Sequence, residues 1–393
     1  MPDISLLVSD LAWPFAIAIA WLAGEFGHRW TGLPRISIYG LLGFILANVK
    51  GGFLPPVDDN IMLLANIAFG LILFEFGYRI NLRWLRNNPW VAASGVAESV
   101  VTFGVVYAVA RAFDTSTLAS LLIASLAMST SPAGLLRVIN EQRGSGQVTE
   151  RMLHLCALNC VLSVFTFKVI VGLWLFHSSG NLWSASSNSL LVLLASAAVG
   201  GFFGVLVPAI MRQLGSLAQD ATVAFALAVI LLVAMAYSLN LSPVLAALTF
   251  GLVARHRRIS LSQAQRNFGA LGDLLTVLLF VVATATLQWE QILAGAGLGL
   301  ALVVARLVTK TACVAAFSGL SGITWRKGAL AGLGLAPVSV FVILLVEQTR
   351  YLGSILLEGL APLAAMTLVL EMLGPVLTQC ALAWARENHH TEG

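Results

Sequence analysis

The feature that most constrains this chain is a hydrophobic stretch that is interrupted at its centre. Residues 125–138, SLAMSTSPAGLLRV, are apolar at both ends and small, hydroxylic and proline-containing in the middle. Proline removes a backbone N–H and clashes with the carbonyl four residues before it, so Pro132 predicts a broken helix. In a bilayer the freed polar groups need partners, so such a break is tolerated only inside protein or beside a cavity.

A second interrupted stretch of the same kind lies late in the chain. Residues 332–343, GLGLAPVSVFVI, contain Pro337 and Ser339 within an apolar segment. Two interrupted hydrophobic segments in corresponding halves are typical of transporters built from inverted repeats, whose site lies at the breaks. We therefore expect helix breaks at Pro132, Pro337 and Ser339, and a site where the two breaks meet.

Composition places both stretches in a membrane protein. The chain is 59% hydrophobic and 10% charged, with a mean hydropathy of +0.90, whereas soluble domains average about 25% charged residues. Its recurring apolar runs predict an all-α polytopic protein with about 13 transmembrane segments. These segments are residues 5–27, 36–50, 60–78, 89–112, 116–138, 152–176, 188–211, 220–238, 241–255, 268–288, 291–318, 327–347 and 356–384. The second and ninth are short. The four cysteines lie in apolar segments, so we expect free thiols.

Lysine and arginine residues indicate the orientation of these segments. With the N-terminus outside, 16 of the 22 basic residues fall at inside-facing ends, which is the bias of membrane proteins. Lys168, Arg306 and Lys310 lie within helices instead. The sequence therefore predicts a multi-pass protein of a bacterial inner membrane, with a short cytoplasmic tail at residues 388–393. The basic residues lie in short loops and form no patch for nucleic acid.

Several segments resemble a known transporter family. Residues 32–48, GLPRISIYGLLGFILAN, are similar to the second helix of the monovalent cation:proton antiporter-2 family, which is sodium/hydrogen exchanger-like. Residues 70–85, GLILFEFGYRINLRWL, resemble a later segment of the same family, and the STSP break with Arg137 matches its broken helix. The order and spacing hold across about residues 15–385.

This resemblance implies the sodium/proton antiporter fold, with inverted repeats and two crossing broken helices. Residues 1–387 would form one transporter domain of a homodimer. Dimerisation helices are expected at roughly 5–80 and 188–255, and core helices at roughly 89–176 and 268–384. The core would move past the dimerisation helices and exchange Na⁺ or K⁺ for H⁺ by alternating access. No cofactor, metal centre or enzymatic activity is expected.

One position departs from the family pattern. The ion-binding helix of the family carries Asn-Asp or Asp-Asp, and the matching stretch here is ALNCV, residues 157–161. Asn159 keeps the first position, but Cys160 stands where the central Asp of the family lies. A thiol is largely neutral at pH 7 and is a poor ligand for a hard cation. The resemblance thus implies an atypical member, whose carboxylate would have to come from elsewhere in the chain.

Two acidic residues are candidates for that carboxylate. Glu98 and Glu371 each lie near the middle of a predicted core helix. An ionisable group there costs about 2.5–3.5 kcal/mol on insertion scales, so each needs a reason to be present. One or both could hold either a proton or a cation, which is the competition that an antiporter needs. The alternative is a structural hydrogen-bonding or ion-pairing role.

Three basic residues could compensate charge at the site. Arg306 and Lys310 are four residues apart on one helix face, and we expect them to neutralise the dipole ends of the half-helices at the crossing. The alternative is a lateral pair that faces loops or headgroups. Lys168 lies nine residues after Asn159, on the opposite helix face. It would either pair with a carboxylate of a neighbouring helix or extend toward the interface.

The hydroxyls at the first break are candidates for neutral ligands. Ser129, Thr130 and Ser131 could coordinate Na⁺ or K⁺ together with carbonyls freed by Pro132. The alternative is local capping of the break. Elsewhere, Glu75 and Arg79 have the spacing of a structural intrahelical pair.

Three functions remain open from the sequence. The leading hypothesis is secondary antiport of a monovalent cation against H⁺. The second keeps the fold and carries an organic anion or other solute on the helix N-termini at the crossing. The third is a sensor homologue that does not transport.

Overall fold

The computed structural model describes residues 4–49, 53–175, 182–213, 221–256, 262–338, 342 and 359–388, and all its regular structure is helical. The helices are α1 (Ile4–Thr31), α2 (Arg35–Asn48), α3 (Asp59–Arg79), α4 (Leu82–Asn87), α5 (Pro89–Ala112), α6 (Thr117–Ala127), α7 (Pro132–Glu141), α8 (Gln147–Leu175), α9 (Leu182–Gln213), α10 (Ala221–Ser238), α11 (Pro243–His256), α12 (Ser262–Ala285), α13 (Trp289–Ala316), α14 (Trp325–Leu333) and α17 (Ala361–Ala385). The predicted all-α class is confirmed.

The predicted segments correspond to these helices. Seven spans are long and apolar enough to cross a membrane, with α6 and α7 counted together, and further apolar helices are shorter. The two segments expected to be short are α2 and α11, each with 14 residues. The helices follow a repeated order, in which an unbroken helix is followed by a broken one and then by another unbroken helix. The first unit is α5, the broken pair α6–α7, and α8; the second is α13, the broken segment that begins with α14, and α17.

The first break lies where Pro132 predicts it. Helix α6 ends at Ala127 and α7 begins at Pro132. Proline fits the first position of a helix, because the N–H that it lacks has no partner in the helix there. The Ser131 hydroxyl accepts the Gly134 N–H at 3.0 Å, and the Ser129 hydroxyl donates to the Leu126 carbonyl at 2.7 Å.

The second break follows α14, and its backbone crosses the first. The Ser131 N–H donates to the Pro337 carbonyl at 3.0 Å, and the Thr130 hydroxyl donates to the Leu335 carbonyl at 3.3 Å. The predicted crossing of two interrupted segments is therefore present. Ser339, the third predicted break residue, lies outside the described residues.

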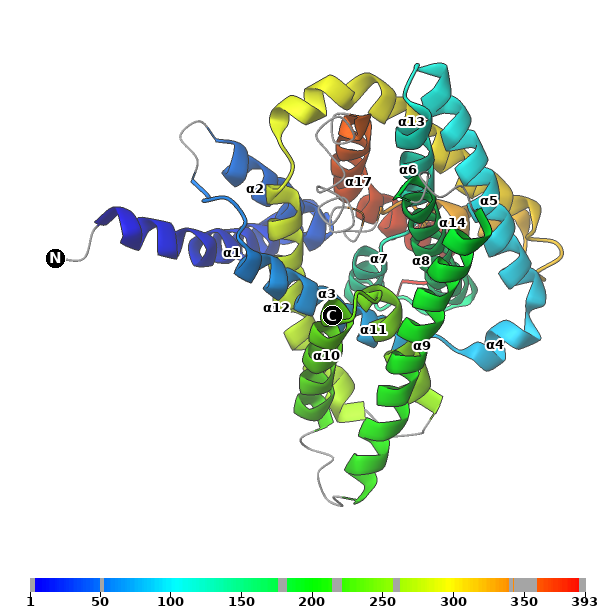
Figure 1. The fold of residues 1–393 in the computed structure, drawn as a ribbon, viewed down its shortest axis with the longest axis horizontal. Helices are drawn as coiled ribbons and strands as arrows, with labels where there is room; N and C mark the ends of the chain where they lie inside the picture. Colours follow the sequence, from blue (N-terminus) through cyan, green and yellow to red (C-terminus); the bar gives the residue numbers. More distant parts are fainter. Residues whose placement is uncertain are drawn as a thin grey trace.

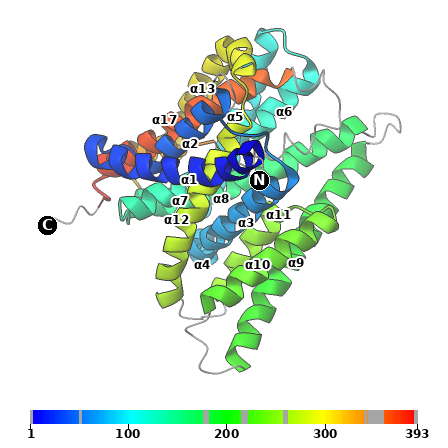
Figure 2. The same cartoon turned by 90° about the vertical axis from the view of Figure 1, so that its left-hand side faces the viewer.

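The helices pack in two groups. Helices α5, α6, α8, α13, α14 and α17 gather around the crossing, and α3, α9, α10 and α11 pack together beside them (Figures 1 and 2). Small residues let the second group pack closely, since a Cβ at Gly251 would lie only 2.1 Å from the Phe74 carbonyl oxygen. Helix α12 packs along α2 and α3, although its residues were expected among the core helices.

Candidate functional site at the crossing of the broken helices

Arg306 on α13 joins the two broken helices. Its side chain is fully buried, and all three guanidinium nitrogens donate to backbone carbonyls. The carbonyls belong to Ala127 (2.9 Å) and Ser129 (2.6 Å) at the end of α6, and to Leu335 (3.2 Å), Ala336 (2.5 Å) and Pro337 (3.3 Å) after α14. Helix C-termini carry partial negative charge, so one buried cation serves both half-helices.

Lys310 lies one turn further along α13 and is also fully buried. Its Nζ lies 2.6 Å from Glu98 Oε1, 2.9 Å from the Met128 carbonyl and 3.4 Å from the Thr130 hydroxyl. The ammonium group therefore sits among a carboxylate, a carbonyl and a hydroxyl oxygen. We call these three oxygens the oxygen nest. Because both bases are enclosed, neither faces loops or headgroups.

Glu98 supplies the carboxylate of the nest from α5. Its side chain has no exposed area, and Oε1 also accepts the Thr102 hydroxyl at 3.2 Å. The second oxygen, Oε2, has no hydrogen-bond partner among the described residues. One carboxylate oxygen is thus held by Lys310, and the other is left without a donor in a buried environment, where such a group is costly.

Asn159 connects α5, α8 and the first break. Its Oδ1 accepts the Ser99 hydroxyl at 2.9 Å, and its Nδ2 donates to Thr130 Oγ1 at 3.2 Å. Thr130 therefore contacts Asn159, Lys310 and the second broken segment at once. Of the three hydroxyls at the first break, Thr130 is the one that joins the polar site.

Cys160 also contacts this break, but as a donor. Its Sγ donates to the Thr130 carbonyl at 3.1 Å, and Cys156 donates to the same oxygen at 3.5 Å. An ionised carboxylate accepts hydrogen bonds and cannot donate them. The surroundings of Cys160 thus suit a thiol, and the carboxylate of the site comes from Glu98 on another helix.

These residues form one closed cluster. We call it the crossing cluster, and its members are at most 1% exposed: Glu98, Ser99, Thr102, Thr130, Asn159, Cys160, Arg306 and Lys310. Ser99 and Thr102 were not predicted. The spacing of Thr102, four residues after Glu98, is a signal that could have found it, whereas Ser99 is found only through its contact with Asn159. Every member of the cluster is thus shielded from solvent in the conformation described.

Four of the predicted site residues have side chains apart from the crossing cluster: Ser129, Ser131, Lys168 and Glu371. Ser129 and Ser131 bond the backbone at the break itself, which fits local capping. Lys168 on α8 is half-buried, and no hydrogen bond or ion pair joins it to another residue in the described part of the chain. Among the described residues, Lys168 therefore has no carboxylate partner, and its pairing with a neighbouring helix stays a prediction.

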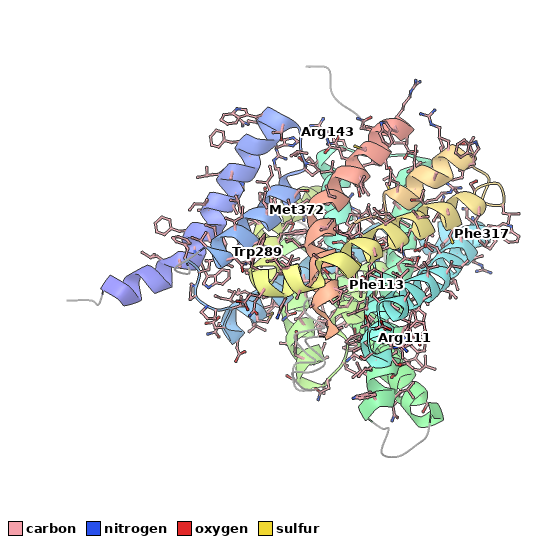
Figure 3. All side chains as sticks on the ribbon, turned by 90° about the horizontal axis from the view of Figure 1, so that it is seen from above. Arg111, Phe113, Arg143, Trp289, Phe317 and Met372 are labelled. Carbon is pink, nitrogen blue, oxygen red and sulfur yellow. The ribbon has the colours of Figure 1, made fainter. Side chains whose placement is uncertain are left out.

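Glu371 is buried on α17, with 2% of its side chain exposed. Its Oε1 has no hydrogen-bond partner in the described ranges, and the structure records no ion pair for it there. The helix packs directly on the second break, because a Cβ at Gly374 would lie 2.6 Å from Pro337 Cα. Figure 3 shows α17 at Met372 beside α13, which runs between Trp289 and Phe317.

A second polar cluster links α7 to α3 and α12. The expected Glu75–Arg79 pair is present at 3.5 Å, and Arg137 lies closer to Glu75, at 3.0 Å. Arg137 also contacts Asp273 on α12 at 2.9 Å. These pairs join the broken helix α7 to α3 and α12.

Comparisons with known proteins agree with this fold. An ammonium/H⁺ antiporter subunit, AmhT, from Alkalihalophilus pseudofirmus is 24% identical over 343 residues, which cover 84% of this chain and 83% of that protein. Two structures of the sodium proton antiporter MjNhaP1 from Methanocaldococcus jannaschii share the fold. One, at pH 8, has a TM-score of 0.66 at 17% identity and covers 97% of both chains. The other, from electron microscopy, has a TM-score of 0.71 at 18% identity and covers 96% of this chain and 98% of that one. The transmembrane sodium/hydrogen exchanger family matches residues 15–384, and the chain therefore belongs to that family.

Proposed function

We propose that this protein exchanges a monovalent cation, Na⁺ or K⁺, for H⁺, and that the oxygen nest is its cation site. The observation that carries the proposal is the position of the Lys310 ammonium, which is itself a monovalent cation held by three oxygens. Carboxylate, carbonyl and hydroxyl oxygens are also the ligands that protein sites offer to alkali cations. The nest therefore fits either the lysine or a transported ion.

The exchange follows from this competition. A cation that enters the nest replaces Nζ beside Glu98, and Lys310 then lies without its counterion in a buried site. A buried ammonium without a counterion is strongly disfavoured, so Lys310 releases its proton as the cation binds. When the cation leaves, a proton returns to Lys310 and the pair with Glu98 forms again. One cation and one proton thus occupy the site in turn.

Alternating access is the movement that we assign to this exchange. The crossing cluster is closed on all sides in the conformation described. We propose that α5–α8, α13, α14 and α17 move as the core against α1–α3 and α9–α12, which would form the dimerisation side of a homodimer. This division transfers α12 from the core, because it packs along α2 and α3. The Arg137 pairs with Glu75 and Asp273 would open during the movement.

Orientation and location are part of the same proposal. The bias of basic residues supports an outside N-terminus and a cytoplasmic C-terminus in a bacterial inner membrane. Two of the basic residues assigned to the inside face, Arg29 and Arg35, both form ion pairs with Glu25.

Ammonium is a second candidate cargo. The nest already holds an ammonium group, and one relative is an ammonium/H⁺ antiporter subunit. An organic anion is less favoured, because Arg306 and Lys310 are both engaged by oxygens of the protein.

The test is cation-dependent proton flux in proteoliposomes. A preset pH gradient is followed with a fluorescent dye while Na⁺, K⁺, Li⁺ or NH₄⁺ is added. Wild-type protein should collapse the gradient with at least one of these ions, and Glu98→Gln should not. Because NH₃ crosses bilayers unaided, Glu98→Gln vesicles are the blank for ammonium.

A matched control separates this effect from a general loss of negative charge. Glu290 is an exposed glutamate at the start of α13, and Glu290→Gln should keep wild-type flux. Flux that persists in Glu98→Gln would contradict the proposed site. An absence of flux with all four cations would favour the solute carrier or the sensor.

A further inference from the structure

The proposed exchange assigns a role to Glu98 but none to Glu371, the second buried acid, which lies on α17. Glu371 Oε1 has no partner among the described residues, and the same holds for the hydroxyl of Thr367, which is 1% exposed. The two residues are one helical turn apart and therefore share a helix face. Two unsatisfied polar atoms on one buried face are unusual, because buried polar groups nearly always have partners.

This face of α17 looks toward the second break. Gly374 and Thr378 follow Glu371 at three and seven residues, so they lie on the same face. Gly374 approaches Pro337 closely, and the Thr378 hydroxyl donates to the Gly334 carbonyl at 3.0 Å. Glu371 thus belongs to the stripe that contacts the broken helix, and it does not face lipid.

No cation of the neighbouring helices is paired with Glu371. Helices α2, α7, α8, α13 and α14 pack against α17. The basic side chains of these helices that have a described partner contact groups other than Glu371. Four of them contact carboxylates or the crossing cluster: Arg35 pairs with Glu25 and Glu141, Arg137 pairs with Glu75 and Asp273, and Arg306 and Lys310 lie within the crossing cluster. The others bond neutral oxygens: Arg151 bonds the Gln147 and Ser321 carbonyls, His154 the Glu150 carbonyl, and Lys327 the Gln147 side chain. Cys156 and Cys160 donate to Thr130, and Lys168, Glu290, Cys313 and Arg326 have no ion pair with Glu371.

An ionised carboxylate in this position would have no ion-pair partner among the described residues. Removing such an ion from water is far more costly than burying the neutral acid. Glu98 avoids this cost through Lys310, and the described part of the chain offers Glu371 no equivalent partner. We propose that Glu371, with Thr367 beside it, is a second proton-binding site that holds its proton in this conformation, in which Glu98 is paired with Lys310.

The place of Glu371 in the repeats gives this site a role. Helix α8 follows the first break and touches it through Asn159 and Cys160, and α17 follows the second break and touches it through Gly374 and Thr378. The acid that is absent from α8 at Cys160 is thus present on the corresponding helix of the other repeat. A role of Glu371 in transport rests on the proposed exchange, whereas the protonation of Glu371 does not depend on it.

Infrared difference spectroscopy tests the inference without requiring transport. Reconstituted protein is titrated from mildly acidic to alkaline pH, and the C=O stretching band of a protonated buried carboxyl is followed. Wild type and Glu98→Gln should both show a band that disappears reversibly as the pH rises. Glu371→Gln should lack this band.

Three results would overturn the inference: a band of full intensity in Glu371→Gln, a band lost in Glu98→Gln instead, or no pH-dependent band in wild type. Should Glu371→Gln fail to fold, Glu371→Asp keeps the acid and should shift the band, and an unshifted band in Glu371→Asp would equally overturn it. A titrating Glu371 band in protein that shows no cation-dependent flux would refute the proposed exchange and leave this site standing.

Discussion

Helices α8 and α17 occupy corresponding places after the two breaks, but they differ in whether their buried polar groups have hydrogen-bond partners. On α8, the polar groups that face the first break are matched: Asn159 bonds Ser99 and Thr130, and Cys160 donates to the Thr130 carbonyl. On α17, Glu371 and Thr367 each have a buried polar atom without a hydrogen-bond partner among the described residues.

This difference shows that two repeats with the same helix architecture can carry different polar and acidic residues at corresponding places. The fold needs two breaks whose carbonyls are neutralised, and Arg306 does this for both at once. Where the titratable acids lie is a separate matter. In this chain one acid lies on α5 against Lys310 and the other on α17, and neither occupies position 160 on α8.

Removing the cation that is paired with Glu98 should have the largest effect. Lys310→Met leaves Glu98 buried without its counterion, and breaking a buried pair in this way costs about 3–5 kcal/mol. We expect a clearly lower melting temperature in detergent and no exchange. The double variant Glu98→Gln/Lys310→Met should recover much of the melting temperature and none of the exchange. Lys310→Met protein that melts like wild type would show that the pair contributes little.

A smaller effect is expected where α17 meets the second break. A Cβ at Gly374 would overlap Pro337, so Gly374→Val should push the helix away and cost about 1–3 kcal/mol through overpacking. Thermal melting and proton flux both measure this. The matched control is Gly297→Val on α13, since a Cβ at Gly297 meets nothing within 4 Å. Equal melting of the two variants would contradict close packing at Gly374.

The smallest effect is expected for substitutions at position 160 on α8. They test whether this position suits a hydrogen-bond donor or a carboxylate, and so how α8 differs from α17. Cys160→Ser keeps a donor for the Thr130 carbonyl, so it should change stability by less than about 1 kcal/mol and preserve exchange. Cys160→Asp places an acid where only a donor fits, and we expect lower stability than in Cys160→Ser. Melting curves of the two variants, recorded side by side, provide the comparison. If Cys160→Asp were the more stable variant, position 160 would suit a carboxylate after all.

Much of this fold follows from local sequence. Hydrophobic length predicts the segments, and proline places the breaks near Pro132 and Pro337, because both signals act within a few residues. The spacing of Arg306 and Lys310 predicts a shared face. Tertiary pairing does not follow from such signals. Which acid meets Lys310, and that Arg137 reaches Glu75 and Asp273, depends on how distant helices pack.

The hydroxyls show the same limit within a single motif. Ser129, Thr130 and Ser131 are equivalent in sequence, but Ser129 and Ser131 bond the backbone at the break, and Thr130 turns to Asn159 and Lys310. Local chemistry could name the three candidates. The direction of each side chain depends on the geometry of the break, which the residue types do not encode.

The central claim is that a cation replaces the Lys310 ammonium in the oxygen nest and thereby releases a proton. The most direct measurement is proton release from purified protein in weak buffer, followed with a pH dye, on addition of the cation that supports flux. The account predicts release by wild type and none by Glu98→Gln or Lys310→Met, with Glu290→Gln behaving like wild type. Release of the same size from Glu98→Gln would contradict it.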